Sequence, residues 1–160
     1  MMHLKFTVYG TAAGKGSFKA FMRPGMKHPV VVNDSKRTVP WEHAVVSAAF
    51  EARRAMGHEP MLGRVAVSVA FYLPPPSSAP KKKAIHPTKK KDDLDKLVRS
   101  VLDALTRSGA FLDDGQVVRI LAAKSYAGRP EGDPLGASGV PRAVVSVWSE
   151  ETGGAACGAA

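Results

Sequence analysis

The strongest constraint on the fold is a helical repeat in the second half of the chain. Apolar residues recur there at steps of three and four: Leu94, Leu97, Val98, Val101, Leu102 and Leu105. This spacing places them along one side of an α-helix, so that side must be covered by a hydrophobic core. Gly109 can adopt the left-handed conformation that ends helices. We therefore predict a helix from about Leu94 to Arg107 that packs against other elements.

The elements expected around this helix are mostly strands. Alternating or β-branched apolar residues predict strands in "LKFTVYG" (4–10), "VVVN" (30–33), "RVAVSVAFYL" (64–73), "QVVRILAAKSYA" (116–127) and "RAVVSVWSE" (142–150). The first two are expected to form a hairpin with a long loop. A second helix is predicted from Val39 to Met56, with Thr38 as its N-cap and Gly57 at its end. This order predicts an α+β fold: a small mixed β-sheet with two helices packed on one face.

Length and composition limit the class of protein. The 160 residues suffice for one domain with a hydrophobic core, which we place at residues 1–150. The Gly- and Ala-rich end at 151–160 is expected to be a disordered tail, and the single cysteine of the chain, Cys157, excludes an internal disulfide. No apolar run approaches the roughly 20 residues that span a bilayer, and the N-terminus lacks the pattern of a signal peptide. A cytoplasmic protein is therefore expected.

The charge of the chain is strongly positive, with a net charge of +9. A proline-containing segment, residues 74–91, holds six lysines: Lys81, Lys82, Lys83, Lys89, Lys90 and Lys91. This concentration favours a polyanionic partner, nucleic acid rather than an anionic membrane. Two interpretations of the segment stay open: a clamp for the DNA backbone and a solvated flexible connector.

The glycine-rich stretch "GTAAGKGS", which begins at Gly10, is not a nucleotide-binding P-loop. Only three residues separate Gly10 from Gly14, and a glycine follows Lys15 where the motif needs Ser or Thr. The stretch is either a flexible loop or a loop that contacts DNA through Lys15, Lys19 and Arg23. The five histidines show no paired metal-ligand spacing, so zinc chemistry is weakly supported.

Three aspartates are the candidates for chemistry. Asp93 and Asp95 would face away from each other on one regular helix, about 200° apart, so they can converge only if Asp93 lies just before the helix. Asp114 follows that helix and can approach Asp93 only if the segment "SGAFLDD" folds back along it. Taken singly, these residues suit helix caps, the helix dipole or a turn. Taken together, clustered carboxylates favour a divalent cation, and oxygen ligands suit Mg²⁺.

A polar stripe on the same helix has two interpretations. Asp95, Arg99 and Asp103 are spaced at steps of four, which is typical of surface ion pairs worth a few tenths of a kcal/mol. Alternatively, Arg99 reaches a phosphate bound beside the carboxylates and stabilises the negative charge that develops there. The spacing alone does not separate the two.

The segment "DDLDKLVRSVLDALTRSGAFLDDGQVV" resembles the core motif of the RusA family of Holliday-junction resolvases, which occur in bacteria and their phages. The resemblance implies that Asp93, Asp95 and Asp114 bind Mg²⁺ and cleave DNA. We expect the adjacent Asp113 to be a turn residue or a residue that supports the metal ligands. Where the family has a functional lysine this chain has Arg99, which keeps the charge but not the compact ammonium.

Two lysines also belong to the resemblance. Lys96 stands where asparagine is common in the family, and Lys124 matches a frequent lysine. The resemblance further implies a symmetric homodimer that nicks opposed strands of four-way junction DNA. Alternatives are a junction-binding protein of the same fold without activity, and a nuclease that acts mainly on other branched DNA.

Overall fold

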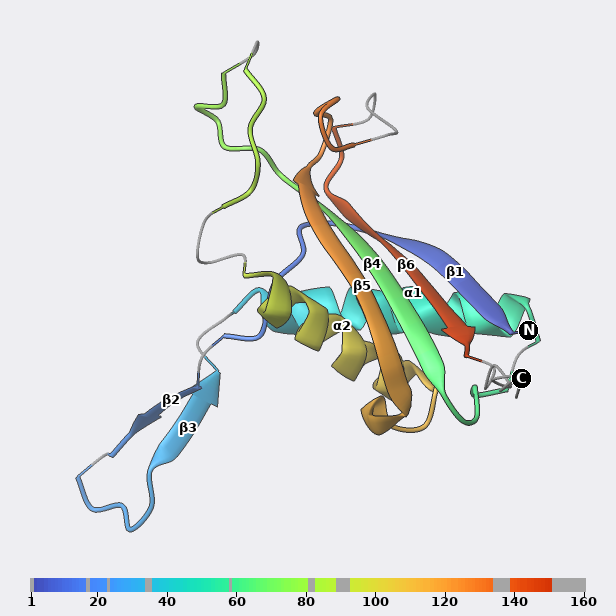
Figure 1. Ribbon diagram of the computed structural model, residues 1–160. Helices are drawn as coiled ribbons and strands as arrows, with labels where there is room; N and C mark the ends of the chain where they lie inside the picture. The colour runs from blue at the N-terminus through green and yellow to red at the C-terminus, as the bar shows by residue number, and fades with distance from the viewer. Residues whose placement is uncertain are drawn as a thin grey trace, which may run out of the picture.

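The computed structural model describes residues 2–16, 18–22, 24–33, 36–57, 59–80, 83–88, 93–133 and 139–150 (Figure 1). Its elements follow the order expected from the sequence, with one further strand and one short 3-10 helix: β1 (His3–Tyr9), β2 (Phe18–Phe21), β3 (Val30–Asn33), α1 (Thr38–Ala55), β4 (Val65–Leu73), α2 (Leu94–Ser108), η2 (Asp114–Gln116), β5 (Val117–Tyr126) and β6 (Arg142–Ser149). The α+β class is confirmed.

The main sheet has four strands in the order β1-β6-β4-β5. The pairs β1/β6 and β4/β6 are antiparallel, whereas β4/β5 is parallel, so the sheet is mixed as predicted. The expected hairpin between the first strand and residues 30–33 is wrong. β1 pairs with β6 at the other end of the chain, and β3 pairs with β2 in a separate hairpin. Apolar alternation shows that a strand is half-buried, but it does not identify the neighbouring strand.

The two helices lie side by side on one face of the main sheet (Figure 1). They bury their apolar sides against strand residues that alternate inward, and together these form one core. Its centre includes Val45 and Ala49 of α1, Leu97, Val101 and Leu105 of α2, Val67 and Val69 of β4, and Val145 and Val147 of β6. The prediction of two helices on one face of a mixed sheet is therefore confirmed.

The bounds of α2 have local causes. Asp93 is the N-cap, with extended backbone angles of φ −58° and ψ 130°, and the helix ends where Gly109 takes a positive φ of 72°. The predicted N-cap of α1 is wrong, because Arg37 occupies that position and Thr38 is already helical. The hydroxyl of Thr38 instead donates a hydrogen bond of 2.8 Å to the carbonyl oxygen of Gly14. This bond attaches the start of α1 to the glycine-rich loop.

None of the helices in the described residues is long and apolar enough to cross a membrane. The tail predicted at 151–160 lies outside the described residues. The core formed by the four-stranded sheet and the two helices is built from residues between Leu4 and Val147.

Candidate active site

Two of the candidate carboxylates lie at the amino end of α2. Asp93 precedes the helix, which is the position that convergence of Asp93 and Asp95 requires. Its carbonyl oxygen accepts a hydrogen bond of 3.1 Å from the backbone N–H of Leu97. Its side chain makes no capping hydrogen bond and instead lies 3.2 Å from the ammonium of Lys96. Asp95 is exposed in the first turn. The Asp93 carboxylate is thus not engaged as a helix cap, which weakens its purely structural interpretation.

The glycine-rich loop packs directly on this end of the helix. The backbone N–H of Lys15 donates a hydrogen bond of 3.2 Å to the carbonyl oxygen of Lys96. A Cβ at Gly14 would lie only 2.8 Å from the Cβ of Lys96, so only glycine permits this approach. The Lys15 ammonium forms an ion pair with Asp103, which lies about two turns after Lys96 on α2. The loop therefore brings the Lys15 cation to Asp103 of the helix.

Asp114 lies at the other end of α2, in a turn built by its neighbour. The carboxylate of Asp113 caps the short helix η2 by accepting a hydrogen bond of 2.7 Å from the N–H of Gly115. Asp113 is therefore a turn residue, as predicted. Asp114 is the first residue of η2, and its side chain is exposed.

Gln116 holds this turn in place, a role that sequence reasoning missed. Its Oε1 accepts hydrogen bonds from the backbone N–H groups of Leu112 (2.8 Å) and Asp113 (3.0 Å). Its Nε2 donates to the carbonyl oxygens of Met61 (3.1 Å) and Gly63 (2.8 Å), in the segment before β4. The signal was present in the sequence, because "DDGQ" places an amide where a reciprocal capping box needs one.

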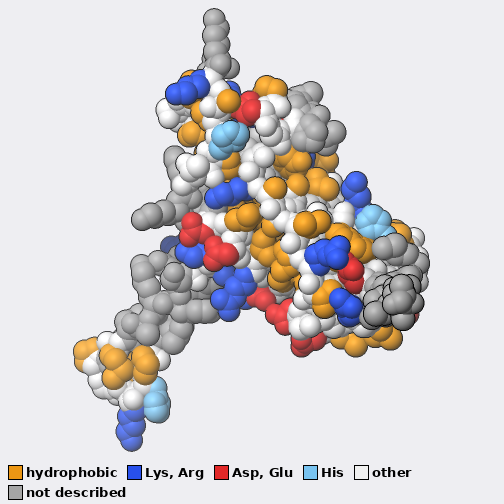
Figure 2. Space-filling view, in the orientation of Figure 1, with side chains coloured by type: hydrophobic (Ala, Val, Ile, Leu, Met, Phe, Trp, Pro, Cys, Tyr) orange, Lys and Arg blue, Asp and Glu red, His pale blue; other side chains and the backbone are white. Residues whose placement is uncertain are grey.

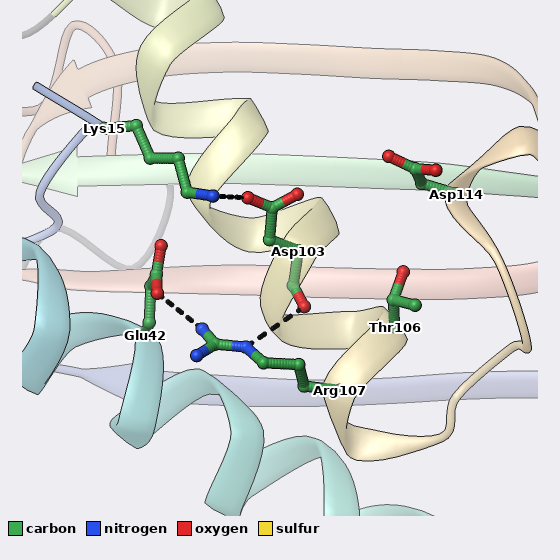
Figure 3. Close-up of a pocket in the computed structure, with 6 residues that line it drawn as sticks. All are labelled: Lys15, Glu42, Asp103, Thr106, Arg107 and Asp114. Carbon is green, nitrogen blue, oxygen red and sulfur yellow. Dashed lines mark hydrogen bonds and ion pairs between the residues drawn. The ribbon is translucent and has the colours of Figure 1, made fainter. Parts of the chain in front are cut away.

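A cavity of about 420 Å³ opens between α1, α2 and this turn (Figure 3). Its lining is almost entirely charged or polar: Lys15, Glu42, Asp103, Thr106, Arg107 and Asp114. Arg107 donates a hydrogen bond of 2.5 Å to Glu42, and Lys15 pairs with Asp103. The second oxygen of Glu42 is buried and has no hydrogen-bond partner within the described residues. The cavity thus presents carboxylates with two nearby cations, a suitable setting for a charged ligand.

The three candidate aspartates do not meet within one chain. Asp103 follows Asp93 by about 15 Å of helix, and Asp114 lies beside Asp103 and Thr106 rather than beside Asp93. The connection between α2 and β5 returns only to the last turns of the helix, at Asp103 and Thr106, and does not reach back to Asp93 (Figure 1). Accordingly, the described residues contain no group of three Asp, Glu, His or Cys side chains placed to hold a metal ion. Their oxygen atoms suit Mg²⁺, but their arrangement in a single chain does not.

The remaining candidate residues are dispersed. Arg99 is exposed on α2, and Asp103 of the predicted stripe pairs with Lys15 of the loop. Lys124 is half-buried on β5, opposite Phe71 of β4. Lys83 is exposed, and Lys19 belongs to β2, where the structure describes the backbone. The other candidates lie outside the described residues: Arg23, Lys81, Lys82, Lys89, Lys90, Lys91 and the neighbouring Asp92.

The described part of the lysine-rich segment is attached to the loop after β5. Arg129 donates hydrogen bonds to the carbonyl oxygens of Pro80 (2.9 Å) and Lys83 (2.6 Å). Glu131 accepts one of 3.1 Å from the N–H of Ile85 and another from Arg129. Hydrogen bonds from its own backbone N–H, from Ile85 and from Arg129 lower the pKa of Glu131. At Pro80, Lys83 and Ile85 the segment is therefore anchored, which the flexible-connector interpretation did not include.

Comparison with known proteins adds two findings. A family model described as endodeoxyribonuclease RusA matches residues 19–132. The uncharacterized protein YqaN of Bacillus subtilis (strain 168) is 31% identical over 139 residues, which cover 79% of this chain and 90% of that protein. The matched region contains β3 to β5 and all but the first residue of β2, including both ends of α2 and the turn around Asp114.

Proposed function

Because the chain belongs to the RusA family of endodeoxyribonucleases, we propose that it resolves Holliday junctions by Mg²⁺-dependent cleavage of opposed DNA strands. The observation that carries this proposal is the family match itself, which spans the whole motif from Asp93 to Gln116. The net charge of +9 supports a nucleic-acid partner, since cations bind the phosphate backbone and release its counterions.

The proposed roles follow from the chemistry of the side chains. Asp93, Asp95 and Asp114 are the proposed oxygen ligands of Mg²⁺, which when bound lowers the pKa of a water molecule and stabilises the leaving oxygen. Arg99 is exposed on the same helix and is the proposed contact to the phosphate at the site of cleavage. Lys96 pairs with Asp93 and Lys15 pairs with Asp103 of the same helix, and both are proposed to supply positive charge for the approaching DNA.

A second copy of the chain is required to complete this site. Asp93 and Asp95 lie at one end of α2 and Asp114 at the other, so one chain supplies only part of the ligand set. If two α2 helices run antiparallel across a twofold axis, the end with Asp114 in one chain faces the end with Asp93 in its partner. Two equivalent sites then form, as nicking of two opposed strands requires.

The surface around β5 supports this arrangement. β5 is an edge strand of the main sheet, and four exposed apolar side chains define the β5 patch: Leu112 (63% exposed), Val118 (48%), Ile120 (44%) and Leu121 (55%). Figure 2 shows apolar side chains gathered over this strand. Exposed apolar edge strands tend to pair with another chain. Twofold pairing of β5 is antiparallel, and because α2 runs roughly antiparallel to β5 (Figure 1), the two α2 helices would also be antiparallel.

The first test is cleavage of a labelled four-way junction with and without Mg²⁺, with linear duplex, flap and fork DNA as comparison substrates. We expect paired nicks in the junction that disappear in EDTA. Asp93→Asn and Asp114→Asn should each abolish cleavage while junction binding persists, whereas the exposed Glu51→Gln on α1 should cleave normally. Cleavage by either aspartate variant at the parental rate would contradict the assignment.

The same assay separates the alternative functions. Tight junction binding without nicking would favour a binding protein, which the replacement of the family lysine by Arg99 makes a specific second candidate. Faster cleavage of flaps or forks than of four-way junctions would favour a nuclease for other branched DNA.

Complementation tests the shared site. Co-expressed Asp93→Asn and Asp114→Asn chains form mixed dimers in which one site has both mutations and the other has neither. About a quarter of all sites are then intact, so nicking of single strands should return. If each site lies within one chain, every site carries a mutation and the mixture stays inactive. Analytical ultracentrifugation of each sample checks that dimers are present.

A further inference from the structure

A second cavity, of about 310 Å³, lies at the end of β1 beside the start of α1. It plays no part in the proposed cleavage site. Its walls combine the aromatic ring of Tyr9, the basic residues Lys36 and Arg37, and the indole of Trp41. Its volume is at the lower end of the range for small-molecule pockets, which suits a ligand about the size of one nucleotide.

Tyr9 is the most unusual residue in this wall. It is 68% exposed at the last position of β1, although an aromatic ring normally gains from burial. Exposed aromatic rings beside basic side chains are what proteins use to stack unpaired bases, because every base has a π-face. Tyr9 thus offers a stacking surface at the mouth of the cavity.

The positive side of the cavity suits a phosphate. Lys36 and Arg37 are exposed immediately before α1, and the first turn of that helix contains no acidic residue. No side chain caps the helix, so its first backbone N–H groups and its dipole are directed toward this region. An anionic group bound here would be attracted by Lys36, Arg37 and the amino end of α1.

Trp41 provides the independent indication that a ligand belongs here. It lines the cavity and is only 4% exposed, yet its indole N–H has no hydrogen-bond partner within the described residues. A buried indole donor normally has a partner, and leaving it unpaired costs free energy. An acceptor atom of a ligand that draws the indole N–H toward the adjoining cavity would remove that cost.

The cavity is connected to the amino end of α2 by short links. Thr11 lines it, and Gly14, three residues later, packs against Lys96 and accepts the hydrogen bond from Thr38 of α1. A strand bound at Asp93 and Asp95 therefore passes close to this cavity. We infer that the cavity binds one unpaired nucleotide of the DNA substrate, with its base on Tyr9 and its phosphate at Lys36 and Arg37.

This inference rests on the proposed function only in taking DNA as the ligand, so its test avoids cleavage. Binding is measured in EDTA by fluorescence anisotropy of two junctions that carry the same dye at one arm end, one with an unpaired 2-aminopurine at the branch and a matched one with an abasic position there. For the 2-aminopurine junction, Tyr9→Ala should weaken binding about 5- to 100-fold, and Tyr9→Phe should bind normally. For the abasic junction, Tyr9→Ala should bind as tightly as the unmodified protein.

Two further variants serve as controls. Phe50→Ala removes a different exposed aromatic side chain, which lies on α1 outside the cavity (47% exposed). It should leave the affinities for both junctions unchanged. Combined Lys36→Ala and Arg37→Ala should weaken binding of both junctions and lower the salt dependence of each. Equal affinity of Tyr9→Ala and the unmodified protein for the 2-aminopurine junction, or an equal loss on both junctions, would overturn the inference. Normal cleavage with that result would leave the proposed function standing.

Discussion

The two ends of α2 carry the proposed catalytic carboxylates but are built in different ways. At the carboxyl end, Asp114 sits in a turn that Gln116 and Asp113 fix through hydrogen bonds to the backbone. At the amino end, Asp93 forms a half-exposed ion pair with Lys96, and Gly14 of the glycine-rich loop packs against Lys96. One end is therefore preorganised by its own motif, whereas the other depends on a contact between segments distant in sequence.

The largest effect is expected at the carboxyl end from Gln116→Ala. This change removes four hydrogen bonds, two to backbone N–H groups and two to carbonyl oxygens. If Asp114 binds the metal, loss of the residue that orients its turn should lower the cleavage rate by roughly 10- to 100-fold. The free energy of unfolding should fall by about 2 kcal/mol, because net values near 1 kcal/mol per bond are reduced by partial exposure.

Gln116→Glu is the matched control for this prediction. It keeps the acceptor for Leu112 and Asp113 but loses the donor to Met61 and Gly63. Its rate should fall between those of the unmodified protein and Gln116→Ala in a single-turnover cleavage assay. A Gln116→Ala protein that unfolds at lower denaturant concentration but cleaves at the parental rate would show that the turn does not position Asp114 for catalysis.

The next effect concerns stability at the same end of α2. Arg107 pairs with Glu42, which is only 7% exposed, so Arg107→Ala leaves a buried carboxylate without its cation. Since the arginine side chain is itself 48% exposed, we expect a loss of about 2 kcal/mol rather than the 3–5 kcal/mol of a fully buried pair. Chemical denaturation measures it.

The second variant in this comparison is Glu42→Gln combined with Arg107→Ala. The neutral amide removes the unpaired charge, so the double variant should be more stable than Arg107→Ala alone. A double variant that is less stable than Arg107→Ala would show that packing of α1 against α2, rather than the ion pair, sets the stability of this contact.

Local features explain how much of the fold the sequence could predict. The apolar repeat from Leu94 and the positive φ of Gly109 depend on neighbours within one or two turns, so the bounds of α2 were predicted to within one residue. The strand β2 was missed because "FKAF" is short and lies in a glycine- and lysine-rich stretch. The pairing of β1 with β6 joins residues near opposite ends of the chain, and no local pattern encodes it.

In the candidate site, too, positions set by local sequence could be predicted, whereas positions set by contacts distant in sequence could not. Asp93 as the residue before the helix and Asp113 as a turn residue follow from local sequence, and both positions are confirmed. The separation of Asp114 from Asp93 could not be predicted, because it depends on where the chain turns after α2. The contact of Gly14 with Lys96 was equally hidden, since glycine is as common in mobile loops as at close backbone approaches.

A smaller effect is expected at the amino end from Gly14→Ala. The added methyl group would lie 2.8 Å from the Cβ of Lys96 and must displace either the loop or the first turn of α2. We expect a loss of about 1–2 kcal/mol, because overpacking is partly offset by the lower entropy of the unfolded chain. Lys96→Ala keeps the Cβ and removes only the ion pair with Asp93, so it should be nearly neutral. Equal stability of Gly14→Ala and the unmodified protein in chemical denaturation would contradict the close approach.

The smallest effect tests how the chain enters the amino end of α2. Hydrogen bonds from its own backbone N–H, from Ile85 and from Arg129 lower the pKa of Glu131 in the folded protein below the ordinary value of 4.5. Because the pKa is lowered on folding, ionised Glu131 stabilises the folded state at pH values above 4.5. This stabilisation is lost as the pH falls below 4.5 through the pKa of the folded state. Because Glu131 is solvent-accessible, the anchor should open locally rather than unfold the domain. Amide hydrogen exchange at Ile85 should therefore lose protection over this pH range in the unmodified protein, whereas Glu131→Gln should show low protection at every pH. Protection at Ile85 that is independent of pH and of this substitution would mean that Arg129 alone anchors the segment.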